Sequence, residues 1–253
     1  MRWGKIDSPD IIDTTCEVVH DKEVKAVEAN TTLLIHGGGP NNGVAFYDNS
    51  TTARALTTVG DTKFDSSQYK FRVSSIKFDG TGDYITALDS DDWDFGSGNF
   101  TIDTWIRFAA LPANLTLMGL AGQYEIGPGT YWNWLVQNNA GTYQFVVGAH
   151  GITGLFPGSG VSVNIDSLVV NTWYHFAVVR NGNLMLFFKD GIQQGISQPF
   201  TGSITPIASV LAVGSLRVSD YTNGWLDEFR ISKGIARWTS DFTPPTAPYD
   251  SSI

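Results

Sequence analysis

Aromatic rings in the middle of the chain are the side chains whose types and spacing point most clearly to chemistry. Five of them stand among glycines and asparagines, and they are Tyr131, Trp132, Trp134, His150 and Phe156. Exposed rings stack on sugars while amide and carboxylate groups bind the hydroxyls, so we expect these residues to form a glycan-binding site on the rim of the fold. The alternative is structural, because residues 131–135 have the periodicity of a strand that would bury Trp132 or Trp134.

The acidic residues do not indicate an enzyme. The chain has 20 Asp and 5 Glu, and short aspartates favour turns. Glycoside hydrolysis needs two carboxylates about 5–10 Å apart across the sugar bond. Residues 89–94 could supply such a pair, but they form a loop flanked by glycines. No Gly-x-Ser-x-Gly motif marks a nucleophilic serine, and Cys16 lacks a matching His/Asn framework. We therefore expect no catalytic residues.

Composition restricts the class of protein further. A chain of 253 residues that is 42% hydrophobic is long enough for one large all-β domain. Its net charge of −9 makes nucleic acid an unexpected partner, since phosphate binding needs clustered Lys and Arg. Cys16 is the only cysteine, so no intrachain disulfide or thiolate metal cluster is expected. The first residues lack the apolar region of a secretory signal, and no segment has the apolar length of a membrane helix, so we expect neither Sec export nor membrane insertion.

Alternating apolar and polar residues predict the elements that position these side chains. Residues 74–108 read as strand, tight turn, strand, acidic loop and strand, and residues 100–108 alternate as a half-buried strand does. Residues 173–180 and 184–189 are predicted to form a hairpin through Asn181 and Gly182, which favour a type I′ turn. Residues 224–232 are the predicted closing strand, and residues 148–160 a long glycine-rich loop on the rim.

Three sequence blocks also resemble a known family. The blocks KFDGTGDYI…DFGSGNFTIDTWIRF, NTWYHFAVVRNGNLMLFFKDG and GWLDEFRISKGIARW are similar, in this order, to the laminin-G-like jelly roll of the concanavalin A-like lectin/glucanase superfamily. The resemblance covers roughly Thr32 to Tyr249. It implies an all-β fold, an antiparallel two-sheet jelly-roll sandwich over residues 31–253, preceded by an N-terminal arm or docking segment over residues 1–30.

The resemblance also bears on metal binding and catalysis. It implies one structural Ca²⁺ between the first and last strands, held by Asp227 and by oxygens at Asp79 and Gly80. The alternative is that Asp227 hydrogen-bonds the adjacent turn without a metal. Hydrolases of the superfamily carry Glu-x-Asp-x-x-Glu on one strand, and this triplet is absent from the chain. His36 and His175 are expected to be structural, at a strand end and in the core respectively.

The ending RISKGIARW…DFTPPTAPY resembles modules of tailed-phage virion proteins. The expected function is therefore a non-catalytic structural or adhesive virion protein, either a capsid decoration or a fibre or tail subunit. Residues 1–30 would dock on other virion proteins, and the sandwich would face outward at the virion surface, where it would either contact host glycans or simply coat the surface. Such subunits usually form homo-oligomers, and we expect a trimer. The alternative is a bacterial secreted or cell-surface carbohydrate-binding module, located extracellularly.

Overall fold

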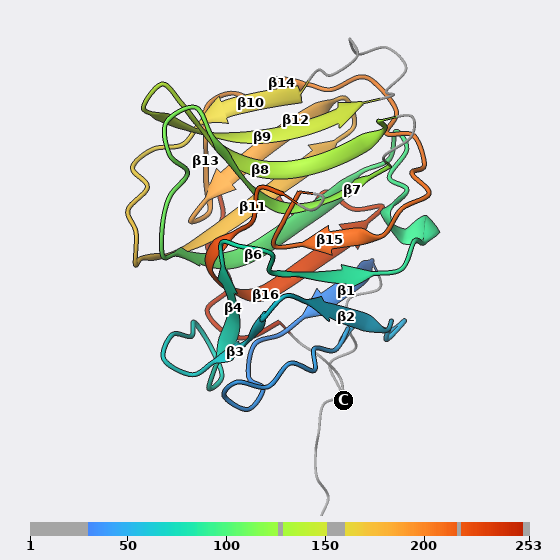
Figure 1. Cartoon of the computed structure of the whole chain (residues 1–253). Helices are drawn as coiled ribbons and strands as arrows, with labels where there is room; N and C mark the ends of the chain where they lie inside the picture. The colour runs from blue at the N-terminus through green and yellow to red at the C-terminus, as the bar shows by residue number, and fades with distance from the viewer. Residues whose placement is uncertain (1–29, 126–128, 151–159, 217–218, 250–253) are drawn as a thin grey trace, which may run out of the picture.

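Two antiparallel β-sheets lie face to face in the computed structural model (Figure 1), which describes residues 30–125, 129–150, 160–216 and 219–249. Within these residues there is no α-helix, and the one helical element is a 3₁₀ turn, η1 (Asp91–Trp93). Nor does any helix in the described part of the chain have the length and apolarity needed to cross a membrane. The predicted all-β jelly-roll sandwich is confirmed.

The first sheet has nine strands, and its main order is β13-β12-β11-β6-β16-β4-β3, with β1 paired to β16 and β14 to β12. Its strands are β1 (Thr31–Ile35), β3 (Lys63–Asp65), β4 (Ser75–Asp79), β6 (Phe100–Phe108), β11 (Trp173–Asn181), β12 (Leu184–Lys189), β13 (Ile192–Gln193), β14 (Gln198–Pro199) and β16 (Asn223–Lys233).

The second sheet has seven strands in the order β10-β9-β8-β7-β15-β5-β2. Its strands are β2 (Leu56–Val59), β5 (Tyr84–Ala87), β7 (Leu117–Tyr124), β8 (Tyr131–Asn139), β9 (Thr142–His150), β10 (Gly160–Asn164) and β15 (Leu211–Val213). The predicted hairpin joins β11 and β12, but its central turn residues are Gly182 and Asn183, and of these only Gly182 has a positive φ (59°). The predicted type I′ turn is therefore wrong, because that type needs a positive φ at both central residues, and a glycine at the first of them fits type II′.

The main core lies between the two sheets, where the apolar residues of alternate strand positions meet. Phe100, Ile102, Ile106 and Phe108 of β6 pack there with Phe145 of β9. A strand places successive side chains on opposite faces, so the predicted alternation of β6 is confirmed. The expectation that β6 is only half-buried is wrong, because residues 100–106 and 108 are all buried.

The C-terminal segment (residues 234–249) covers the outer face of the nine-stranded sheet, which points away from the main core. Trp238 and Phe242 of this segment stack at 4.0 Å and pack on a small second core that includes Val179 and Phe188. The nine-stranded sheet is therefore buried on both faces over this area, whereas the seven-stranded sheet has no such cover among the described residues.

A buried polar group lies beneath the same segment. Arg230 donates to Asp103 from Nε (3.0 Å to Oδ1) and from Nη2 (3.2 Å to Oδ2), and the Tyr249 hydroxyl donates to the same carboxylate. Burial raises the pKa of Asp103, but the charge of Arg230 and the contact with His175 outweigh it and hold that pKa below its ordinary value. The His175 ring is fully buried, with Nε2 3.0 Å from the Tyr249 hydroxyl, so its predicted place in the core is confirmed.

Strand β16 changes partner halfway along its length. Its first half pairs with β4, and its second half pairs with β1, so the first and last strands are neighbours as predicted. Between Asp227 and Arg230 the register with β6 shifts by one residue, which is a β-bulge. Glu228 lies in this bulge with φ 56°, a left-handed conformation that is rare for a residue with a side chain. The bulge turns the Glu228 carboxylate toward the end of β1.

Candidate functional site

The five residues predicted to lie on the rim do not lie together in the structure. Trp132 is 2% exposed and Trp134 is fully buried, so both indoles belong to the core and their prediction as rim residues is wrong. The physical reason is the period of the strand: residues 132 and 134 both point inward, while their neighbours at 131 and 133 point outward. Phe156 lies outside the described residues.

Tyr131 and His150 come together on the outward surface of the seven-stranded sheet. They are paired across β8 and β9, and their rings stack with centroids 5.9 Å apart and planes 18° apart. On the other side of Tyr131, Tyr124 of β7 is its cross-strand partner, at a centroid distance of 6.2 Å. All three side chains are half-buried. Three adjacent strands thus place three aromatic rings in one row.

A row of amides crosses the same surface further along the strands. The Gln137 amide donates to Gln144 (2.8 Å), and the Gln144 amide donates to Asn164 on β10 (2.8 Å). Between the rows, Asn133 lies over Gly148, where a side chain at position 148 would collide with its amide oxygen. Along β8, Gln137 lies six positions after Tyr131, which is roughly 20 Å of strand.

We call this surface the open face, and it consists of Tyr124, Tyr131, Asn133, Gln137, Gln144, His150 and Asn164. It offers aromatic rings at one end and amide donors and acceptors at the other, which suits a long, uncharged, hydroxyl-rich ligand. Sequence reasoning missed the amides. The alternation of Gln144 with buried Phe145 in the run TYQFVVGAH was the signal that they point outward.

The residues predicted to bind calcium are not brought to one place. Asp79 is the register partner of Asn223, four residues before Asp227 on β16, so about 13 Å of strand separates the two aspartates. The Asp227 carboxylate accepts three backbone N–H groups, from Gly37, Lys70 and Phe71, each at 3.1 Å. Burial raises the pKa of Asp227 to about 6 despite these bonds. This geometry matches the alternative of a turn held by Asp227 without a metal.

Asp79 instead lies beside two other aspartates at a pair of adjacent turns. The carboxylates of Asp61, Asp79 and Asp83 have oxygens within 4.8 Å of one another. Asp83 is buried and accepts the backbone N–H groups of Asp79 (2.9 Å) and Asp61 (2.8 Å), and burial raises its pKa. Calcium binding stays a prediction, and these three residues are its candidate ligands.

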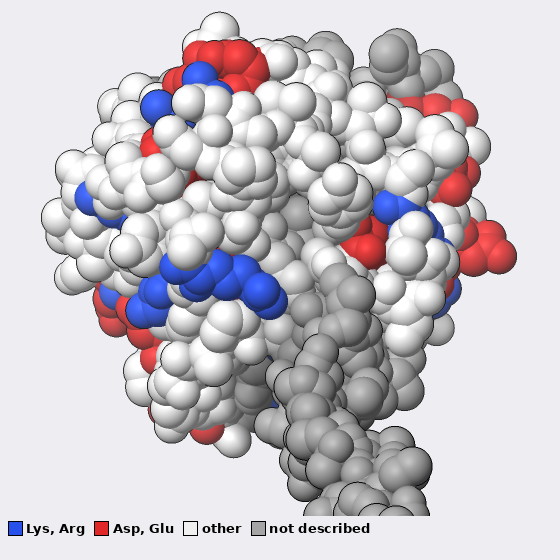
Figure 2. Space-filling view, turned by 90° about the horizontal axis from the view of Figure 1, so that it is seen from below, with Lys and Arg blue, Asp and Glu red and all other residues white. Residues whose placement is uncertain are grey.

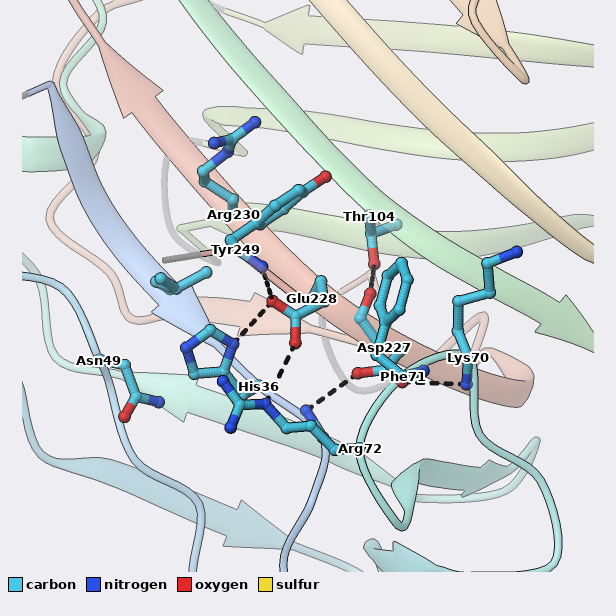
Figure 3. A network of polar contacts seen from close by, with 12 residues as sticks. His36, Asn49, Lys70, Phe71, Arg72, Thr104, Asp227, Glu228, Arg230 and Tyr249 are labelled. Atoms are coloured by element: carbon cyan, nitrogen blue, oxygen red, sulfur yellow. Dashed lines mark hydrogen bonds and ion pairs between the residues drawn. The ribbon is translucent and has the colours of Figure 1, made fainter. Parts of the chain in front are cut away.

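His36 occupies the strand end predicted for it and contacts the β16 bulge (Figure 3). Its Nδ1 lies 2.7 Å from Oε2 of Glu228, which also accepts the backbone N–H of Tyr249 (2.8 Å). Arg72 approaches the other oxygen of Glu228, with its Nε at 3.7 Å from Oε1. The bulge thus ties β1, the loop before β4 and the C-terminal segment to one buried carboxylate.

The antiparallel jelly roll, with one sheet covered by a terminal segment and the other open and polar, defines a lectin-like β-sandwich domain. The family model of the concanavalin A-like lectin/glucanases superfamily matches residues 79–237. The chain belongs to this superfamily, as the sequence blocks indicated.

Solved structures share this fold at low sequence identity. The binding domain of Paraclostridial Mosquitocidal Protein 1 aligns with a TM-score of 0.58 and 16% identity over 81% of this chain and 49% of that one. The receptor binding domain of botulinum neurotoxin D gives 0.57 and 14%, over 82% and 50%. The chain thus spans about half the length of these two structures.

A smaller domain is matched over almost its whole length. Domain 4 of AbnA, a GH43 extracellular arabinanase from Geobacillus stearothermophilus solved in complex with arabinotriose, aligns with a TM-score of 0.55 and 14% identity, covering 82% of this chain and 95% of that one. At these identities the likeness concerns the fold. No curated protein sequence matches the chain.

Proposed function

We propose that the chain is a non-catalytic carbohydrate-binding domain and that the open face contacts a neutral glycan. The observation that carries the proposal is the row of Tyr124, Tyr131 and His150 beside the linked amides of Gln137, Gln144 and Asn164. A sugar ring presents an apolar face for stacking and hydroxyls that pair with amides, so the two rows match the two kinds of surface on one oligosaccharide.

Two structural relatives support a glycan as the ligand. The arabinanase domain was solved with arabinotriose, and the binding domain of botulinum neurotoxin DC was solved with SialylT. The latter has 14% identity and a TM-score of 0.55 to this chain. The neurotoxin structure is described as a binding domain, and the arabinanase structure is a separate domain of its enzyme in complex with a sugar, which supports a role without catalysis here.

The wider role that we propose is that of a virion protein in a tailed phage, displayed at the virion surface. In this proposal, residues 1–30 dock on other virion proteins, the subunit forms a homo-oligomer, and the open face contacts glycans of the host. Residues 1–29 lie outside the described part of the chain, so this proposal rests on the sequence resemblance. The second candidate, a secreted or cell-surface carbohydrate-binding module, is favoured by the likeness to the arabinanase domain.

A glycan array probed with the full chain tests the binding proposal. The matched variants are Tyr131→Ala, which removes the middle ring of the aromatic row, and Tyr69→Ala, which removes a tyrosine that is 51% exposed and lies in the loop before β4. An aromatic contact is worth roughly 1–1.5 kcal/mol, so Tyr131→Ala should weaken binding about tenfold while Tyr69→Ala leaves it unchanged. Absence of binding to every glycan, or equal binding by both variants, would refute the open face as the site.

Deletion of residues 1–30 separates the two wider roles. A virion subunit should co-sediment with assembled particles and lose that association after the deletion, while glycan binding by the sandwich persists. A free carbohydrate-binding module should show no particle association in either form.

A further inference from the structure

A cavity of about 430 Å³ opens beside the end of β1, away from the open face. Glycine backbone and apolar side chains make up most of its wall, and the side chains that matter here are His36, Pro40, Tyr47, Asn49, Phe64 and Arg72. Pockets for small ligands measure about 300–1,000 Å³ and combine apolar walls with a few polar groups. We call this cavity the His36 pocket, and it shares no residue with the open face.

His36 supplies the first polar group. The side chain is 8% exposed, and its Nε2 has no hydrogen-bond partner. An ionised carboxylate only accepts, so the contact of Glu228 with Nδ1 places a proton on Nδ1, and in the neutral imidazole Nε2 is then an acceptor. Nearly all buried polar atoms in proteins are paired, so this unpaired nitrogen, buried within a side chain that lines the cavity, indicates a donor that a ligand supplies after the ring turns toward it.

Arg72 supplies hydrogen-bond donors to the pocket, and Asn49 supplies an acceptor. The guanidinium of Arg72 has one ion pair, 3.7 Å from Nε to Oε1 of Glu228, and its terminal N–H groups have no partner among the described residues. The amide nitrogen of Asn49 donates to the Tyr47 carbonyl (3.1 Å), which leaves its oxygen as an acceptor. Figure 3 shows Asn49 on the side of His36 away from Glu228.

The charges around the pocket favour a neutral ligand. Glu228 balances Arg72, and Asp227 lies directly behind the glycine backbone of the wall, with Oδ1 3.1 Å from the amide nitrogen of Gly37. An anion attracted by Arg72 would therefore meet two carboxylates close by. Seen from the end that carries residues 36–49, most of the surface is uncharged, and the Lys, Arg, Asp and Glu side chains form separate patches (Figure 2).

The apolar part of the pocket has a shape that suits the face of a sugar ring. Tyr47 is 70% exposed although it is a large aromatic residue, and Phe64 and Pro40 line the same cavity. An exposed ring beside a partly polar cavity offers a stacking surface for the C–H groups of a pyranose.

We propose that the His36 pocket binds the terminal residue of a neutral sugar through two adjacent hydroxyl groups. One hydroxyl donates to Nε2 of His36, the pair accepts from the guanidinium of Arg72, and Tyr47 covers the ring. A vicinal diol fits because it donates and accepts at neighbouring positions, as these two side chains require. This second site does not depend on glycan binding at the open face.

Saturation-transfer NMR on the full chain tests the proposal, with D-mannose, D-galactose, L-fucose and D-glucose as probes. At least one should give a signal, and O-methylation of a hydroxyl in its diol should abolish it. Two variants address the pocket. Asn at position 36 can keep an N–H donor for Glu228 while removing Nε2, so His36→Asn should lose the signal, and Tyr47→Ala should weaken it about tenfold.

The outcomes decide between the two surfaces. Tyr47→Ala changes an exposed side chain and keeps the test valid if His36→Asn does not fold. A signal that survives Tyr131→Ala but not Tyr47→Ala supports the His36 pocket, whatever the open face does. The proposal is overturned if no probe binds, if methylation has no effect, or if the signal depends on Tyr131 and not on Tyr47.

Discussion

Removal of Arg230 tests whether the buried charges under the C-terminal segment hold that segment in place. Arg230→Met keeps most of the side-chain volume but removes both hydrogen bonds to Asp103, and the guanidinium that lies 3.9 Å from the centre of the Tyr249 ring. The carboxylate that remains is fully buried. Breaking one side of a buried ion pair costs about 3–5 kcal/mol because the other charge is left uncompensated.

The geometry places the expected loss at the lower end of that range. Asp103 keeps the hydroxyl of Tyr249 as a donor, and His175 Nε2 lies 3.5 Å from its Oδ2. We therefore expect Arg230→Met to lower the free energy of unfolding by about 3 kcal/mol at neutral pH. Urea denaturation followed by tryptophan fluorescence measures this, and the control is Arg107→Met, whose half-buried arginine bonds Asn171 at the surface and should cost less than about 1 kcal/mol.

The loss of stability in Arg230→Met should also become smaller as the pH falls. In the native protein the pKa of Asp103 is lowered, so its contribution to stability is present above the unfolded value of about 4 and is lost as the pH falls through the lower folded value. Without Arg230, burial raises the pKa of Asp103 instead. The carboxyl of the variant can then take up a proton at a higher pH than the native carboxyl does, so the deficit of the variant should shrink as the pH falls from neutral. A deficit below about 1 kcal/mol, or one that stays constant with pH, would refute this reasoning.

Two further measurements concern the other carboxylates. Calcium should raise the midpoint of thermal unfolding relative to EDTA, and Asp79→Asn should reduce that rise; identical midpoints with and without calcium would contradict a calcium site at the acidic turns. Because burial raises the pKa of Asp227 to about 6, the protonated carboxyl stabilises the fold below the unfolded value of about 4, and this contribution is lost as the pH rises through about 6. Between about pH 5 and pH 8 the free energy of unfolding should therefore fall by about 1.4 kcal/mol more in the native protein than in Asp227→Asn, and parallel pH profiles would contradict this.

The sequence was sufficient for the architecture because strands and turns are specified locally. The alternation in residues 100–108 and the pair Asn181-Gly182 each identify an element from a few neighbouring residues, and the structure confirms both. The covered outer face of β6 depends instead on contacts such as Tyr249 with Asp103, 146 residues apart. No local pattern contains that information.

In the candidate site, too, local sequence patterns determine some features, and contacts between distant residues determine the others. Period-two alternation could have assigned Trp132 and Trp134 to the core, because both share a face with buried Val136. The grouping of Asp79 with Asp61 and Asp83, in contrast, arises when two connections meet, each of which joins one sheet to the other. The unpaired nitrogen of His36 also follows from the bulge at Glu228, whose left-handed backbone is not evident from the residue type.

The position of β16 in the sheet has a consequence for how the chain folds during synthesis. This strand pairs with β6, β4 and β1, and yet it is the last of the described strands to emerge from the ribosome. Until residues 223–233 emerge, β1 and β4 lack a partner that they hold in the finished sheet, and their edges are open to pairing with other chains. Closure of the nine-stranded sheet is therefore a late event of high contact order, and chains that stop before β16 should aggregate rather than fold.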